Sequence, residues 1–70
     1  MKYKVAIKAG RKIRLLRKRQ KMSQEELAEK VGLHYTTIGR IERGESNPPI
    51  QTVNKIAQVL KVPVSEIFNR

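Results

Sequence analysis

Apolar residues recur at helical spacing along most of the chain, and the first such stripe lies near the amino terminus. Ala9, Ile13 and Leu16 fall on one side of a helix, while lysine and arginine occupy most of the other directions. The pattern predicts a helix over about residues 6–20. Leu15 points away from this stripe, so it is either an ordinary exposed leucine or part of a contact with another chain.

A capping box marks the start of a second helix. The segment 23–26 has the required form, in which the Ser23 hydroxyl accepts the amide of Glu26 and the Glu26 carboxylate reaches back. Gly32 is placed to end this helix in a left-handed conformation that costs other residues about 1 kcal/mol. The apolar face of the helix consists of Leu27, Ala28 and Val31.

A third helical pattern follows after a very short connection. Only Leu33 and His34 separate Gly32 from the segment Tyr35 to Arg43, which Gly44 closes. A turn of about three residues forces two short helices to cross at a steep angle. The sequence therefore predicts a helix-turn-helix at about residues 24–43.

The rest of the chain adds a loop and one or two more helices. Residues 45–49 are predicted as a loop, because neither proline fits a helix interior, and residues 65–68 can form a short turn after Pro63. The apolar stripe between them consists of Ile50, Val53, Ile56, Ala57 and Leu60. We expect an all-α fold, a compact bundle of four or five helices that forms a single domain over residues 1–70.

The third predicted helix has an inner and an outer face. Ile38 and Ile41 point one way, and the opposite side gathers Thr36, Gly39, Arg40 and Arg43. An ordinary solvated surface can have this composition. However, the outer face carries no acid, and the short helix opens directly from a tight turn, so it can enter a DNA groove end-first.

Particular side chains of this helix suit contacts with base edges. Thr36 can donate or accept hydrogen bonds at base edges, and its methyl group can contact the methyl of thymine. Arg40 can donate two hydrogen bonds to the O6 and N7 atoms of guanine. Tyr35 can reach a base edge or a phosphate, and a pure packing role is the alternative. Gly39 costs about 1 kcal/mol relative to alanine, and close approach of the helix to DNA would explain it. Phosphate contacts are expected from Gln24, Thr37, Arg43, Ser46 and Asn47.

The net charge of +10 is concentrated at one end of the chain. The first 21 residues contain ten lysines and arginines and no acid, whereas the remaining six basic residues are balanced by six glutamates. Such a polycation binds nucleic acid or an anionic membrane. The role of the basic extension, residues 1–8, stays open. No apolar run is long enough for a membrane span or a signal peptide, so we expect a cytoplasmic protein without a membrane partner.

The composition argues against catalysis, metal sites and bound cofactors. The absence of cysteine excludes disulfides and thiolate zinc sites, and one histidine makes any other metal site improbable. The sequence shows no glycine-rich phosphate loop and no nucleophile beside a plausible base. We therefore expect neither an enzyme nor a cofactor.

Several motifs occur in a characteristic order over residues 10–68. They are Gly10, residues 13–17, residues 23–28, Gly32, Ile38, residues 41–44 and Asn47-Pro48. In this order the chain resembles the Cro/C1-type helix-turn-helix family of phage repressors and XRE-like bacterial regulators. The resemblance implies a five-helix repressor-like fold that binds palindromic double-stranded DNA as a dimer and regulates transcription.

The resemblance also assigns roles to single residues. It implies base contacts from Tyr35, Thr36 and Arg40, with Gln24 at the edge of the site. It further implies a partly buried ion pair between Arg17 and Glu42. The chain departs from the family pattern at several helix ends and in the loop, namely at Lys21, His34, Glu45 and Pro49.

The likeness leaves the assembly and the partners open. For the contact between two copies of the chain, we expect Val59, which lies off the stripe of its helix, together with Ile67 and Phe68, although the last helix can equally be ordinary core. A membrane-surface peptide does not explain the capped and glycine-bounded helices. The stronger alternative is a protein-binding role, as an antitoxin-like partner or a bridge to the transcription machinery.

Overall fold

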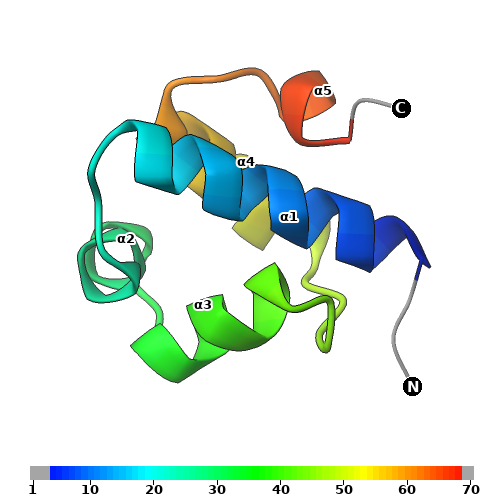
Figure 1. Ribbon diagram of the computed structural model, residues 1–70, viewed down its shortest axis with the longest axis horizontal. Coiled ribbons are helices and arrows are strands. Elements are labelled where there is room, and N and C mark those ends of the chain that lie inside the picture. Colours follow the sequence, from blue (N-terminus) through cyan, green and yellow to red (C-terminus); the bar gives the residue numbers. More distant parts are fainter. Residues whose placement is uncertain (1–3, 69–70) are drawn as a thin grey trace.

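The computed structural model describes residues 4–68, which contain helices joined by short turns and no strand. In chain order the helices are α1 (Lys4–Arg19), α2 (Gln24–Val31), α3 (Tyr35–Glu42), α4 (Ile50–Leu60) and α5 (Val64–Ile67). Figure 1 shows α1 running across the molecule, with α4 behind it and α3 below. The all-α prediction is confirmed, with five helices in the described part of the chain.

The two helices of the predicted helix-turn-helix cross steeply. In Figure 1, α2 is seen almost end-on while α3 lies across the view. The capping box is present, because Ser23 Oγ accepts the amide of Glu26 and a carboxylate oxygen of Glu26 accepts the amide of Ser23. Gly32 ends α2 with φ of 86°. Both ends of α2 therefore form as the sequence predicts.

Two lysines adopt the left-handed conformation that elsewhere in the chain is taken by glycine. Lys21 follows α1 with φ of 56°, and Lys61 caps α4 with φ of 60°. A side chain in this region costs free energy that a glycine does not. Each of these two helix ends is therefore less stable than it would be with glycine at the same position.

One face of every helix packs into the hydrophobic core. Its fully buried large side chains are Ile13, Leu27, Ile38, Ile56, Leu60 and Ile67. The predicted stripe of α4 is correct from Val53 onward, but Ile50 is exposed. Ile50 is the first residue of α4, directly after Pro49, and is 58% exposed, so the helical periodicity extends to it but burial does not. Leu15 is exposed on the outer face of α1.

The first helix begins earlier than predicted and packs closely on α3. It starts at Lys4 rather than near Ala6, so residues 4–8 of the basic extension are helical, while residues 1–3 lie outside the described part of the chain. Gly10 faces the carbonyl oxygens of Ile41 and Glu42, where no Cβ would fit. This close approach fixes the distance between α1 and the carboxyl end of α3.

Within residues 4–68, no helix is both long enough and apolar enough to cross a membrane.

Candidate nucleic-acid interface

The third helix is anchored by the two isoleucines that the sequence assigns to its inner face. Ile38 is 0% exposed and Ile41 is 3% exposed, and both belong to the core. Tyr35, Thr36 and Arg40 are all exposed. The described structure therefore places the three proposed base-contacting residues on one helix whose other side is fixed in the core.

The first turn of α3 is organised by His34. This residue is the N-cap, and its Nδ1 accepts the amide of Thr36 at 3.3 Å and lies 2.8 Å from Thr36 Oγ1. Because Nδ1 accepts the amide, the hydroxyl of Thr36 donates to it and keeps its lone pairs for other donors. The ring of Tyr35 stacks on that of His34, with centroids 4.8 Å apart. Histidine thus performs the N-cap role for which helices in general favour serine, threonine, aspartate or asparagine.

A buried ion pair joins α1 to the last residue of α3. Arg17 Nε donates to Glu42 Oε2 at 2.7 Å and Nη2 donates to Oε1 at 3.0 Å. Arg17 Nη1 also donates to the carbonyl of Met22 at 2.7 Å. The two charged side chains are only 8% and 2% exposed. The pair implied by the family resemblance is therefore present, in the two-pronged geometry that suits a guanidinium and a carboxylate.

A residue of α2 also forms a hydrogen bond with the carboxylate of Glu42. Gln24 Nε2 donates to Glu42 Oε1 at 3.0 Å. An amide nitrogen has two hydrogens, so Gln24 retains one donor after this bond. The carboxylate of Glu42 thereby connects the side chains of three helices at the edge of the exposed face of α3.

Gly39 makes room for neighbouring side chains of the protein. A Cβ at this position would lie 3.2 Å from Arg43 Nη1 and 3.6 Å from Gln24 Oε1. The hypothesis that Gly39 allows close approach to DNA remains a prediction. A side chain larger than alanine would displace the ends of Arg43 and Gln24, a constraint that the sequence did not indicate.

The proposed phosphate-contacting residues fall into two groups. Gln24 and Arg43 line one hollow, and Thr37 is half-buried on α3. Arg43 also forms an exposed ion pair with Glu45 at 3.1 Å. Ser46 and Asn47 instead line a small hollow between the start of α1 and α5. These two residues are thus not among the residues that line the hollow of Gln24 and Arg43.

The proposed dimer contacts need one correction. Ile67 is 1% exposed and belongs to the core of its own chain, so its side chain is not available to a second copy. A helix of four residues is too short for periodicity to show which face is buried. Phe68 is exposed, and Val59 is half-buried against the edge of the core.

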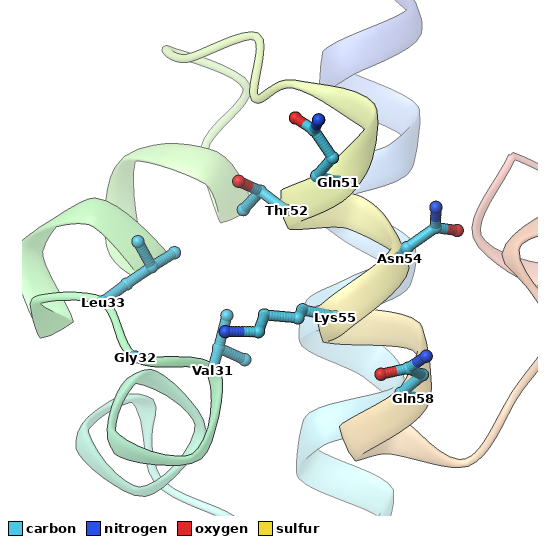
Figure 2. A pocket seen from close by; sticks show the side chains of 8 residues that line it. All are labelled: Val31, Gly32, Leu33, Gln51, Thr52, Asn54, Lys55 and Gln58. Carbon is cyan, nitrogen blue, oxygen red and sulfur yellow. The ribbon is translucent and has the colours of Figure 1, made fainter.

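A separate groove lies between α4 and the turn that follows α2. Its volume is about 490 Å³, and Figure 2 shows its lining of Val31, Gly32, Leu33, Gln51, Thr52, Asn54, Lys55 and Gln58. Three amides, the hydroxyl of Thr52 and one lysine form the polar part, with neither a carboxylate nor a histidine among the lining residues. Among the described residues, no group of three or more potential metal ligands occurs.

Known proteins share both the sequence pattern and the arrangement of helices. A helix-turn-helix family model matches residues 13–67. A protein of Archaeoglobus fulgidus, described as an uncharacterized HTH-type transcriptional regulator, is 40% identical over 57 residues, which is 81% of each chain.

Two solved structures extend this similarity to three dimensions. The restriction-modification controller protein C.AhdI from Aeromonas hydrophila has a TM-score of 0.90 and 35% identity, over 94% of this chain and 100% of the other. The biofilm regulator SinR, solved in complex with DNA, has a TM-score of 0.82 and 37% identity, over 87% of this chain and 98% of the other. These proteins are named as regulators and not as enzymes. The chain belongs to the Cro/C1-type helix-turn-helix family of transcriptional regulators.

Proposed function

We propose that the protein is a sequence-specific repressor that inserts α3 into the major groove of double-stranded DNA. The observation that carries this proposal is the orientation of α3, because Ile38 and Ile41 are buried while Thr36 and Arg40 are exposed. Arg40 contacts guanine through two hydrogen bonds, and Thr36 and Tyr35 contact neighbouring bases. The solved complex of the similar regulator SinR with DNA supports the ligand class.

Backbone phosphates fix the position of the helix on the duplex. Gln24 keeps one amide hydrogen for a phosphate oxygen, and Arg43 can exchange its exposed partner Glu45 for a phosphate. Thr37, Ser46 and Asn47 complete the proposed set. Because Ser46 and Asn47 line a different hollow from Gln24 and Arg43, their contacts are the first that mutagenesis should test.

The protein acts as a dimer on a palindromic operator in this proposal. A twofold-symmetric pair places two copies of α3 about one DNA turn apart, roughly 34 Å, so half-sites are expected at that spacing. Val59 and Phe68 remain the proposed contacts between the copies. Pairing that occurs only on DNA is consistent with so small a domain.

A selection from randomised duplex DNA with the purified protein tests the proposal. We expect a consensus with twofold symmetry and half-sites one helical turn apart. In the variant Arg40→Gln, preference at one position of each half-site should fall by about 1–3 kcal/mol, or roughly 5- to 150-fold, with little change elsewhere. The absence of any consensus, or an unchanged consensus with Arg40→Gln, would contradict the proposal.

The salt dependence of binding separates DNA recognition from the protein-binding alternative. Neutralising about six phosphates predicts a slope near −5 in a plot of log affinity against log salt concentration. Arg19→Gln serves as a matched control, because Arg19 is an exposed arginine of α1 outside the proposed contact set. A slope near zero for the unmodified protein would favour a protein partner.

A further inference from the structure

Two adjoining hollows are lined by residues of α1 and of the carboxyl end of α3, the helix that lies below α1 in Figure 1. The first, of about 240 Å³, is lined by Arg14, Arg17, Gln24, Glu42 and Arg43. The second, of about 270 Å³, is lined by Ile7, Arg11, Arg14, Glu42 and Arg43. Because they share three lining residues, we treat them as one feature, the α1–α3 hollow.

The charges around the α1–α3 hollow do not balance. Glu42 is the only acid among its lining residues, and that carboxylate is already bound by Arg17 and Gln24. Arg43 is paired with Glu45. Within residues 4–68, neither Arg11 nor Arg14 forms an ion pair or a side-chain hydrogen bond, and both are exposed. Two guanidinium groups at the hollow are thus left without an anion in the described structure.

The chemistry of the hollow suits a phosphate. A guanidinium group presents a planar fork of donors that matches phosphate oxygens, and two such groups from one helix can bind the same anion. The hollow is open to solvent, which a DNA backbone requires. The buried carboxylate of Glu42 repels such an anion little, because Arg17 already compensates its charge.

The position of the hollow selects DNA as the source of the phosphate. Gln24 and Arg43, two of the residues proposed to contact the DNA backbone, line the same hollow as Arg14. A phosphate bound there would be a neighbour, on the same DNA strand, of the phosphates that Gln24 and Arg43 are proposed to contact. A membrane headgroup would have to approach the same face that α3 presents to the duplex.

We infer that Arg11 and Arg14 of α1 bind a backbone phosphate just outside the base pairs contacted by α3. This inference rests on the proposed function and extends its interface from the helix-turn-helix to the first helix. It gives two of the ten basic residues of the amino-terminal segment a specific task. The contact contributes affinity without sequence preference.

The test compares equal charge changes on two sides of one helix. Arg14→Gln, Arg11→Gln and the double variant remove the proposed donors. Arg19→Gln is the control, since Arg19 is exposed and lies about 140° around α1 from Arg14. Circular dichroism and thermal melting should show all variants folded like the parent, because none of these side chains is buried.

Affinity for the selected operator is then measured by fluorescence anisotropy over a range of potassium chloride concentrations. Losing one phosphate contact should lower the magnitude of the salt slope by about 0.9, which corresponds to roughly an eightfold loss of affinity near 0.1 M salt. We expect this change for the double variant, with most of it already present in Arg14→Gln. The consensus sequence should not change, and Arg19→Gln should retain the parental slope.

Methylphosphonate substitution of single operator phosphates locates the contact. One position flanking the half-site should weaken binding of the parent protein but should not weaken binding of the double variant further. Equal effects of Arg14→Gln and Arg19→Gln, or a double variant with parental slope, would overturn the inference while operator recognition by the parent still stands. Competition by millimolar inorganic phosphate at constant ionic strength, relieved in the double variant, would instead assign the hollow to free phosphate and overturn it.

Discussion

Removing Arg17 is the sharpest test of how the fold is held together. This side chain makes two bonds to Glu42, at 2.7 and 3.0 Å, and a third to the carbonyl of Met22 at 2.7 Å. The variant Arg17→Met keeps much of the volume but leaves the carboxylate of Glu42 buried, with Gln24 as its one remaining partner in the described structure. The loss of stability comes mainly from the unpaired charge left buried on Glu42, and less from the hydrogen bonds that are lost.

The expected loss is large compared with the stability of so small a domain. Removing one partner of a buried ion pair costs about 3–5 kcal/mol. A chain of 70 residues has a total stability of roughly 3.5–10.5 kcal/mol, at about 0.05–0.15 kcal/mol per residue. Arg17→Met should therefore lose roughly 30% or more of the stability, and its melting temperature should fall by at least about 12 °C.

Urea unfolding followed by circular dichroism at the helical signal measures this loss. The double variant Arg17→Met/Glu42→Leu removes the stranded charge and should recover at least about 2 kcal/mol of the loss. Lys12→Met is the matched control on the same helix. It breaks the Lys12–Glu66 pair, which is 3.5 Å long with side chains 27% and 40% exposed, and should cost less than about 1 kcal/mol.

Two results would refute this account. Equal stability of Arg17→Met and Lys12→Met would mean that burial of Glu42 carries no penalty. A double variant no more stable than Arg17→Met would mean that the lost bonds and not the buried charge destabilise the protein.

Three substitutions that remove or introduce a glycine give further predictions, each measured by urea unfolding or thermal melting. Gly10→Ala should destabilise by about 1–3 kcal/mol, because its Cβ would overlap the carbonyl oxygens of Ile41 and Glu42; a gain in stability would contradict the close packing of α1 on α3. Gly39→Ala should raise stability by up to about 1 kcal/mol, since its nearest neighbour is the flexible end of Arg43, and normal operator binding would refute the close-approach hypothesis. Lys61→Gly should stabilise by about 0.5–1 kcal/mol by relieving the left-handed conformation, and an unchanged melting temperature would show that no strain is present.

Local sequence signals predicted most of the fold because each depends on residues close together in the chain. The capping box at Ser23 involves residues three apart, and the faces of α3 follow from the spacing of Ile38 and Ile41. The same rule misplaced Ile50, because periodicity shows which residues share a face but not whether another helix covers it. For Ile67 the helix was too short to give a period at all.

The site depended more on tertiary structure. The Arg17–Glu42 pair spans 25 residues and came from the family resemblance, since many arginines and glutamates have compatible spacing. Arg11 and Arg14 were not singled out, because on a helix rich in lysine and arginine every outward charge looks alike in sequence. Only the packing of α1 across the end of α3 distinguishes these two from Arg19.

We expect the buried ion pair to contribute to DNA binding as well as to stability, because it helps to position Gln24. Two apolar side chains of similar volume often hold a fold as well as a buried ion pair does. Here, however, the carboxylate of Glu42 also accepts a bond from Gln24, and this bond directs the remaining amide hydrogen of Gln24. Apolar replacements for Arg17 and Glu42 would restore the packing but would release Gln24. The double variant should therefore recover stability while still binding operator more weakly than the parent, since the network holds a phosphate donor in place as well as the fold.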